Sequence, residues 1–147
     1  MFSREEFISR RRKVFDRMEP NALAILPGNI RMGEFLPFRQ AKEFYYLCGI
    51  EVPNSYLLLD GRDRRTILYL PKRDPQRERS EGPSLSSDDP EPARELTGVK
   101  VEGGLISESL FDQFAQEIRK RSPGAEAEER EDLFIFAWRR HVRYSRV

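Results

Sequence analysis

The stretch Pro37-Phe38-Arg39-Gln40-Ala41-Lys42-Glu43-Phe44-Tyr45-Tyr46-Leu47-Cys48-Gly49 holds the densest aromatic content of the chain, beside an arginine and a glutamine. Residues 44 to 47 predict a short buried strand, because aromatic side chains favour a pleated surface and Gly49 marks an end. Arg39 offers five donors and Gln40 both donates and accepts, so both suit hydrogen bonds to loop carbonyls. We expect this structural role ahead of direct contact with a ligand.

The neighbouring segments extend this strand into a sheet. Residues 55 to 60 and 66 to 70 are apolar runs joined through Asp60-Gly61, where glycine takes positive φ without steric cost, and they predict a β-hairpin with a charged tip. Residues 22 to 26 are wholly apolar and end at Pro27-Gly28, which suits a central strand. Together with the helices described next, these strands predict an α/β fold, a mixed β-sheet flanked by helices.

A helix precedes the strands. Ser3 and Glu6 have capping-box spacing, so the helix is predicted to run from residue 3 towards residue 18. Its apolar side chains recur at helical spacing and predict packing on the sheet; they are Phe7, Ile8, Val14, Phe15 and Met18. Residues 10 to 13 are all basic, but consecutive residues point in different directions around a helix. We therefore expect a solvated face there and not a nucleic-acid contact surface.

The second half of the chain is more polar. Residues 76 to 92 contain few apolar side chains, which predicts a solvated loop with a turn of helix near residues 88 to 96; a disordered linker is the alternative. A short strand at 99 to 101 and a helix from Ser107 follow, and the apolar face of that helix is Leu110, Phe111, Phe114 and Ile118. Residues 133 to 138 predict a last strand, before a basic tail.

Length and composition favour one domain. The chain has 147 residues and a mass of 17.3 kDa. Its 26 basic and 25 acidic residues nearly cancel, so the charge does not indicate a nucleic-acid-binding protein. The single cysteine, Cys48, is expected to be a small buried hydrophobe. The first residues are charged where a secretory signal needs an apolar run, and no stretch is long and apolar enough for a membrane span. We expect a cytoplasmic protein without a membrane partner.

Residues with the spacing of known catalytic or metal sites are missing from the sequence. His141 is the only histidine and lies in the basic tail. Asp88, Asp89 and Glu91 are clustered, but prolines interrupt their loop and leave no rigid scaffold for coordination. Gly103-Gly104 precedes a helix without the lysine of a phosphate-binding loop. We expect no catalytic, cofactor-binding or metal-binding residue in this chain.

The central stretch carries a family resemblance. Pro-Phe-Arg-Gln at 37 to 40 and Glu-Phe-Tyr-Tyr-Leu-Cys-Gly at 43 to 49 resemble the N-terminal domain of the Xaa-Pro aminopeptidase (aminopeptidase P), prolidase and creatinase family. Other segments follow the family in the same order, namely the arginines at 10 to 12, the runs 55 to 60 and 66 to 71, Arg73-Asp74, and residues 78 to 83 and 95 to 99. The resemblance covers residues 3 to 120.

The resemblance implies a creatinase N-terminal-like fold with a ribonuclease H-like motif. It also implies that residues 1 to 147 are a single domain of this type, with the catalytic metallopeptidase domain absent. Full-length relatives release an N-terminal residue that precedes proline, using manganese or another divalent metal held in that catalytic domain. The N-terminal domain packs on the catalytic domain, shapes substrate access and supports oligomers, so this chain alone is expected not to be catalytic.

The resemblance also selects candidate residues for a structural or substrate-approach role. These are Glu34, Phe38, Arg39, Gln40 and Ser80. Members of the family often carry an aromatic residue where Ser80 stands, so a substrate contact at that position departs from the family pattern. A homo-oligomer is expected, with residues 76 to 96 as the contact. The alternative function is a stand-alone protein-interaction domain without a peptidase role.

One hydrophobic core is expected, because strand alternation and helix stripes aim the apolar side chains inward. Its expected members are Phe15, Leu23, Ile25, Phe44, Tyr46, Leu58, Ile67, Phe111 and Phe114.

Overall fold

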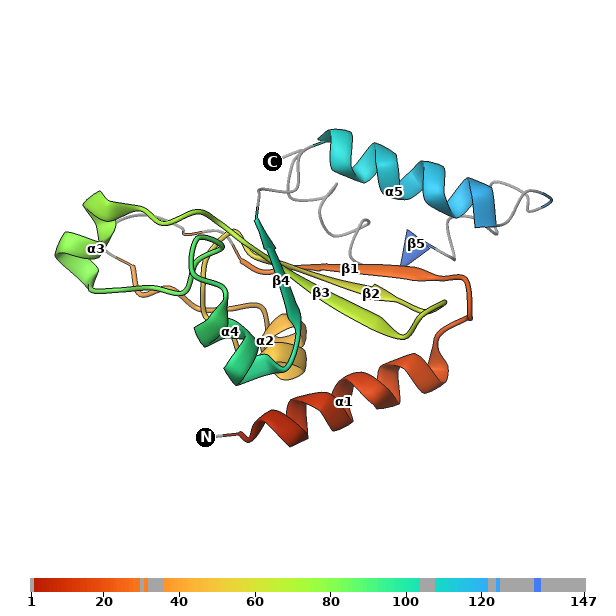
Figure 1. Cartoon of the computed structure of the whole chain (residues 1–147), viewed down its shortest axis with the longest axis horizontal. Coiled ribbons are helices and arrows are strands. Elements are labelled where there is room, and N and C mark those ends of the chain that lie inside the picture. The colour runs from red at the N-terminus through yellow and green to blue at the C-terminus, as the bar shows by residue number, and fades with distance from the viewer. Residues whose placement is uncertain are drawn as a thin grey trace.

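The computed structural model describes residues 2–29, 31, 36–103, 108–121, 124 and 134–135. In this part of the chain a five-stranded sheet with the order β4-β3-β2-β1-β5 has helices on both faces (Figure 1). The strands are β1 Leu23–Pro27, β2 Tyr56–Asp60, β3 Arg65–Leu70, β4 Lys100–Gly103 and β5 Phe134–Ile135. The sheet is mixed, because β2 is antiparallel to β1 and β3, whereas β4 is parallel to β3 and β5 to β1.

The helices form a layer on each face of this sheet. They are α1 Arg4–Arg17, α2 Lys42–Cys48, α3 Pro75–Glu81, α4 Glu91–Thr97 and α5 Glu108–Arg121. Figure 1 shows α1, α2 and α4 on one face and α5 on the other, while α3 lies beyond one end of the strands. The predicted hairpin, first strand, first helix and last helix are confirmed. β5 falls within the predicted final strand, whose other residues, like the basic tail, lie outside the described part.

Residues 42 to 48 are helical, so the prediction of a strand over residues 44 to 47 is wrong. Phe44, Leu47 and Cys48 share the buried helix face, whereas Tyr46 is 50% exposed. Gly49 ends the helix with φ 70°, and a Cβ there would lie 2.3 Å from the Phe7 ring. The apolar run is too short for its period to distinguish a helix from a strand.

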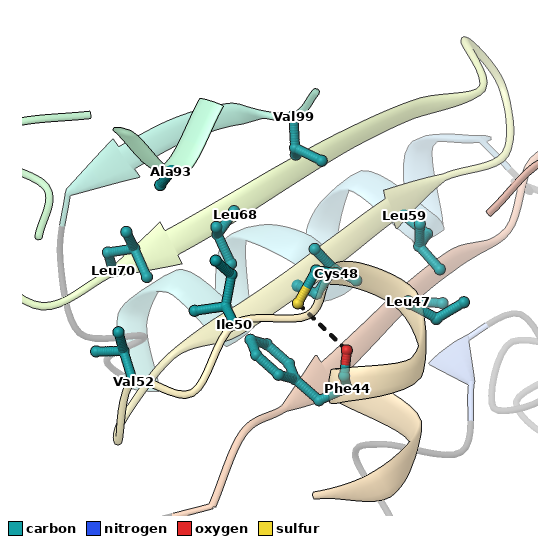
Figure 2. Packing of buried hydrophobic residues seen from close by; sticks show 12 residues of the cluster. Phe44, Leu47, Cys48, Ile50, Val52, Leu59, Leu68, Leu70, Ala93 and Val99 are labelled. Carbon is teal, nitrogen blue, oxygen red and sulfur yellow. Dashed lines mark hydrogen bonds between the residues drawn. The ribbon is translucent and has the colours of Figure 1, made fainter. Parts of the chain in front are cut away.

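The sheet divides the buried side chains into two clusters, so the prediction of a single core is wrong. The larger cluster, which Figure 2 shows from close by, has side chains of α1 packed against it. It contains Ala24, Phe44, Leu47, Cys48, Ile50, Val52, Leu57, Leu59, Leu68, Leu70, Ala93 and Val99. The smaller cluster contains Leu23, Ile25, Leu58, Ile67 and Tyr69, with Phe114 of α5 packed against it. Successive strand side chains point to opposite faces, which produces this division.

The residues expected to meet are therefore separated. Phe15 packs against the same cluster as Phe44. The strand residues among them, with Phe114, lie on the α5 side, and Tyr46 is half exposed. The side chain of Phe111 lies outside the described part of the chain. Most of the predicted core residues are buried. The prediction was wrong in placing side chains from both faces of the sheet in one core.

The first helix begins as predicted, but two of its arginines are buried. The Ser3 hydroxyl accepts a hydrogen bond from the Glu6 amide at 3.2 Å, while the Glu6 carboxylate pairs with Arg10. Arg10 and Arg11 are only 9% and 5% exposed, so the expected solvated face is wrong for both. Arg10 donates to the Tyr46 carbonyl at 3.0 Å, and its guanidinium lies 4.4 Å from the Tyr46 ring centroid.

Arg11 joins α1 to the ends of two other helices. Its guanidinium donates to the Leu47 carbonyl at 2.8 Å and to the Thr97 carbonyl at 2.6 Å. These carbonyls belong to the last turns of α2 and α4. Carbonyls there have no hydrogen-bond partner within the helix, and the negative end of the helix dipole lies there. Burial lowers the pKa of Arg11, while Cys48 acts in the opposite sense. One buried cation therefore connects three helices.

A second buried arginine attaches α5 to the other face. Arg121 donates to both carboxylate oxygens of Asp60, at 2.7 and 2.9 Å, and the two side chains are 6% and 3% exposed. Burial opposes the charge of Asp60, but hydrogen bonds from Arg121 and the Arg62 amide outweigh it and lower the pKa of Asp60. The pair fixes the end of α5 to the end of β2.

Residues 75 to 81 form helix α3, so a disordered linker and an irregular loop are both wrong for this segment. Asp74 caps the helix by accepting from the amides of Gln76 and Arg77, and Pro75 occupies the first turn. Arg73 pairs with Glu78 at 2.5 Å across that first turn. Because α3 buries none of its side chains, these polar contacts define it. The turn of helix expected near residues 88 to 96 is confirmed as α4.

Candidate substrate-approach surface

Two segments that carry predicted site residues leave the sheet at the same end. β1, β3 and β4 run in one direction, since β2 is antiparallel to β1 and β3, and β4 is parallel to β3. The chain after Pro27 and the chain after Leu70 therefore start from the same end of the sheet, where Figure 1 shows α3. Ligands of open α/β sheets bind beyond the carboxyl ends of strands. We call residues 28–31, 36–41 and 71–82 the approach surface, of which the structure describes all but residue 30.

Gln40 holds the first of these segments together. Its Oε1 accepts from the amides of Asn29 and Ala41, at 2.7 and 3.0 Å. Its Nε2 donates to the carbonyls of Ile50 and Val52, at 3.1 and 3.2 Å. The side chain therefore hydrogen-bonds loop carbonyls, as the sequence indicated, and both ends of its amide are already used.

Gly28 allows Gln40 to come this close to the chain. A Cβ at position 28 would lie 2.9 Å from Gln40 Oε1 and 3.1 Å from the Ser55 carbonyl oxygen. The Gly28 amide donates to that same carbonyl at 2.7 Å. A side chain at this position would push the backbone away from Gln40 and weaken the whole arrangement.

Arg39 presents its side chain outward. The residue is exposed, and its guanidinium makes no hydrogen bond to the described part of the chain. Only its main-chain carbonyl is engaged, by Asn29 Nδ2 at 2.9 Å. Phe38, directly before it, is half-buried. Unlike Gln40, Arg39 therefore does not bind loop carbonyls among the described residues, and its charge is turned towards solvent.

An ion pair connects the two segments of the approach surface. Arg31 Nη1 lies 2.7 Å from Glu81 Oε2, which joins the segment after β1 to the last turn of α3. The Arg31 side chain is 22% exposed, and its Nε is buried without a hydrogen-bond partner among the described residues. The pair places an arginine and a carboxylate side by side at the end of the sheet.

The other two predicted candidates lie differently. Ser80 is exposed on α3, one residue before Glu81, and its hydroxyl donates to the Arg77 carbonyl at 3.0 Å. Glu34 lies outside the described residues. The structure thus brings Arg39, Gln40 and Ser80 to one end of the molecule and links their segments through Arg31 and Glu81.

The described residues contain no cluster of three or more His, Cys, Asp or Glu side chains that could hold a metal ion. Asp88 accepts the Arg73 amide at 2.8 Å, and Glu91 pairs with Arg94 at 2.6 Å, so two of the clustered carboxylates have protein partners. His141 lies outside this part of the chain.

Cys48 lies in the larger core cluster with 1% of its surface exposed. Its thiol donates to the Phe44 carbonyl, which Figure 2 marks as a dashed line. Burial raises the pKa of Cys48 to about 12, although the Ile50 amide and Arg11 act in the opposite sense. The thiol is therefore protonated near neutral pH, which agrees with the small buried hydrophobe that was expected.

Two hollows on the described surface lie away from the approach surface. One, of about 460 Å³, is lined by residues of α1 together with Arg64, Thr66 and Gly98. The other, of about 260 Å³, follows α4 and the start of β4.

The sequence did not reveal the Arg31–Glu81 pair, although both residues stand in segments that were noted. The partners are fifty positions apart, and no local spacing relates them. The Gly28-Asn29 step after β1 is the one local signal for this arrangement, since a glycine often marks close backbone approach.

Most of the chain is similar to known proteins. Residues 7–121 match the family model described as "Aminopeptidase P, N-terminal domain". The "Xaa-Pro aminopeptidase" of Haemophilus influenzae is 38% identical over 78 residues, which are 49% of this chain. Human "Xaa-Pro aminopeptidase 3" is 40% identical over 68 residues, or 42% of this chain.

A solved structure shares the fold. "Zn substituted E. coli Aminopeptidase P in complex with product" has a TM-score of 0.63 and 27% identity over 80% of this chain. The matching regions are 27% of that E. coli chain, 18% of the Haemophilus protein and 13% of the human one. This chain therefore corresponds to a small part of each relative.

The agreement extends from sequence to architecture. The mixed sheet flanked by helices is the fold expected from the resemblance, and the matched residues include every described strand except β5. No helix among the described residues is long and apolar enough to cross a membrane. The chain belongs to the family of aminopeptidase P N-terminal domains.

Proposed function

We propose that this chain serves as the N-terminal domain of a metal-dependent Xaa-Pro aminopeptidase. In this role it packs on a catalytic metallopeptidase domain, shapes the path of the substrate and supports oligomers. The family match over residues 7–121 carries the proposal. The curated relatives are named Xaa-Pro aminopeptidases, and this chain corresponds to less than a fifth of the Haemophilus and human proteins.

The chemical step is assigned to the catalytic domain. Hydrolysis by this class of enzyme uses a metal ion to activate water. We expect manganese or another divalent metal in the catalytic domain, and the matched E. coli structure contains zinc. The described residues of this chain offer no group of three ligands that would hold such an ion. The contribution of this domain is to position the substrate, which lowers the barrier by restricting its orientation.

The approach surface is proposed to face the substrate path. Arg39 offers an exposed cationic side chain, while Arg31 and Glu81 fix the neighbouring segments. An exposed arginine can bind a carboxylate or main-chain carbonyls of a peptide through several donors. Substrate contact by Phe38, Ser80 and Glu34 is part of the same proposal, whereas Gln40 has the structural role of holding the loop that carries Phe38 and Arg39. We further propose a cytoplasmic location without nucleic-acid or membrane partners. The balanced charge of the chain supports the absence of a nucleic-acid partner.

A domain exchange tests this function. Residues 1 to 121 would replace the corresponding domain of E. coli aminopeptidase P, and kcat/KM would be measured for short and long Xaa-Pro peptides. We expect Arg39→Ala and Arg31→Ala to lower kcat/KM for long peptides several-fold more than for short ones, because only long peptides reach the approach surface. Arg64→Ala, at an exposed ion pair near the hairpin tip, is the matched control.

The same loss for both peptide lengths in a folded chimera would contradict the substrate-path role. In the isolated chain we expect neither a stoichiometric manganese or zinc site by calorimetry nor release of the N-terminal residue. Tight binding of either ion, or turnover abolished by EDTA, would contradict the assignment of the chemistry to another domain.

A further inference from the structure

Strand β4 forms one border of the sheet. Within the described residues it pairs with β3 only, and the strand order ends with it. In Figure 1 no helix or strand of the described residues lies in front of β4. A border strand exposes unpaired amide and carbonyl groups, which can pair with another chain.

The side chains of β4 form a self-complementary pattern. Lys100 is paired with Ile67 and Glu102 with Tyr69, so both charged residues lie on the α5 face of the sheet, where Ile67 and Tyr69 belong to one cluster. Val101 between them packs against the other cluster. Lys100 Nζ and Glu102 Oε1 lie 2.7 Å apart, and their side chains are 62% and 38% exposed. Such an exposed pair contributes little stability and can exchange partners at low cost.

We propose that β4 pairs antiparallel with the β4 of a second copy of this chain, around a twofold axis at Val101. In this register Lys100 of each copy lies opposite Glu102 of the other, on the same face of the joined sheet. A lysine on a border strand normally opposes association. Here a register centred on Lys100 or Glu102 would bring like charges together, whereas the register centred on Val101 pairs opposite charges.

The surface beside β4 has the charge balance that such a twofold contact needs. The hollow of about 260 Å³ along this border is lined by Arg4, Glu91, Arg94, Glu95, Gly98, Val99 and Lys100. Its three cations and two carboxylates, together with Glu102 on the strand, cancel. A twofold contact places the same patch against itself, so an excess of either sign would repel. Because the strand is short, we expect a weak dimer with Kd of about 10 µM to 1 mM.

This inference deepens the oligomer-forming part of the proposed function and rests on it. It places the contact on β4 and the adjoining hollow, whereas the sequence analysis expected it within residues 76 to 96. The peptidase experiments measure turnover in a chimera, and the present one measures the mass of the 147-residue chain. Failure of one is therefore distinguishable from failure of the other.

Sedimentation equilibrium between micromolar and millimolar concentrations tests the pairing. We expect a monomer–dimer equilibrium that Lys100→Glu and Glu102→Lys each weaken at least tenfold, because each places like charges opposite one another. The double variant K100E/E102K should restore Kd to within about threefold of the parent, since opposite charges meet again. Circular dichroism would establish that each variant is folded, which their exposed positions favour.

Arg73→Glu and Glu78→Arg are matched controls, since they make the same charge changes in the ion pair between Glu78 of α3 and Arg73, which precedes this helix. Their dimers should be unaffected. A second measurement uses Val101→Cys, which places two thiols at the axis and should give a covalent dimer on mild oxidation. A strictly monomeric parent, a dimer insensitive to the single reversals, a double variant without restoration, or loss of the dimer in the α3 controls would each overturn the proposal.

Discussion

The two faces of the sheet are attached to their helices by buried arginines that use different partners. On one face Arg11 binds main-chain carbonyls at the ends of α2 and α4. On the other face Arg121 binds the carboxylate of Asp60 with two hydrogen bonds. The carbonyls do not titrate, whereas the carboxylate does. An arginine therefore provides a pH-independent attachment on one face, and a second arginine provides a pH-dependent attachment on the other.

The faces also differ in how much apolar packing supports each arginine. Arg11 lies against the larger cluster, which includes Phe44 and Cys48, while the α5 side has the smaller one. We expect apolar packing to contribute most of the stability on the first face. On the second face we expect the ion pair to contribute a larger share of the stability. Four experiments test this difference, in order of decreasing expected effect.

Phe44→Ala should cause the largest loss, about 3 to 5 kcal/mol in the free energy of unfolding, because it removes a fully buried ring from the larger cluster. Chemical denaturation measures it. Leu96→Ala, at a side chain 51% exposed on α4, is the control and should change stability by about 0.5 kcal/mol or less. Similar losses in both variants would show that α2 does not pack as described.

Arg121→Met should cost about 3 kcal/mol, because it leaves the buried Asp60 carboxylate without its main partner. Asp60→Asn combined with Arg121→Met should be less destabilised than Arg121→Met alone, since no unpaired charge then remains. Urea denaturation of the single and double variants measures this coupling. Strict additivity would contradict a direct interaction between the two side chains.

Arg11→Met should cost about 2 kcal/mol, since it leaves the carbonyls of Leu47 and Thr97 without their buried donor. Arg12→Met, at the neighbouring exposed position, is the matched control and should be nearly neutral. If the two substitutions had equal effects, the connection of α1 to α2 and α4 through Arg11 would be refuted.

Acid should weaken the α5 face selectively. The pKa of Asp60 is lowered in the folded chain, so its contribution is present above the unfolded pKa of about 3.9 and is lost as pH falls through the folded pKa. Asp60→Asn should flatten the stability profile below about pH 4, whereas Arg11→Met should leave its shape unchanged. Denaturant midpoints across the acid range would measure both, and an unaltered profile in Asp60→Asn would contradict the assignment.

The sequence predicted the elements whose signals are local. The Asp60-Gly61 turn between two apolar runs defines the hairpin, and the Ser3 cap with apolar residues at helical spacing defines α1. Helix α2 was predicted as a strand because seven residues cannot establish a period and because aromatic residues favour strands. Burial was predicted correctly for Phe44 and Leu47 but not for Tyr46, and the conformation was predicted wrongly.

The buried arginines could not have been predicted, because their partners are distant along the chain. Arg11 binds carbonyls 36 and 86 positions away, and main-chain carbonyls leave no mark in a sequence. Four consecutive basic residues are commonly solvated, so Arg10 and Arg11 gave no signal of burial. At the approach surface the amide of Gln40 was predictable from its chemistry, whereas the Arg31–Glu81 pair depends on how two loops meet.

The pairing of β5 with β1 has a consequence for the order of assembly. Leu23 lies beside Phe134, so these strands close a loop of about 110 residues, whereas β2 and β3 are joined by a four-residue turn. Closing long loops is slow compared with forming hairpins. The hairpin with β1 and α2 can therefore form early, and β5 adds to an already ordered border. The β1–β5 hydrogen bonds should be the first in the sheet to exchange with deuterium.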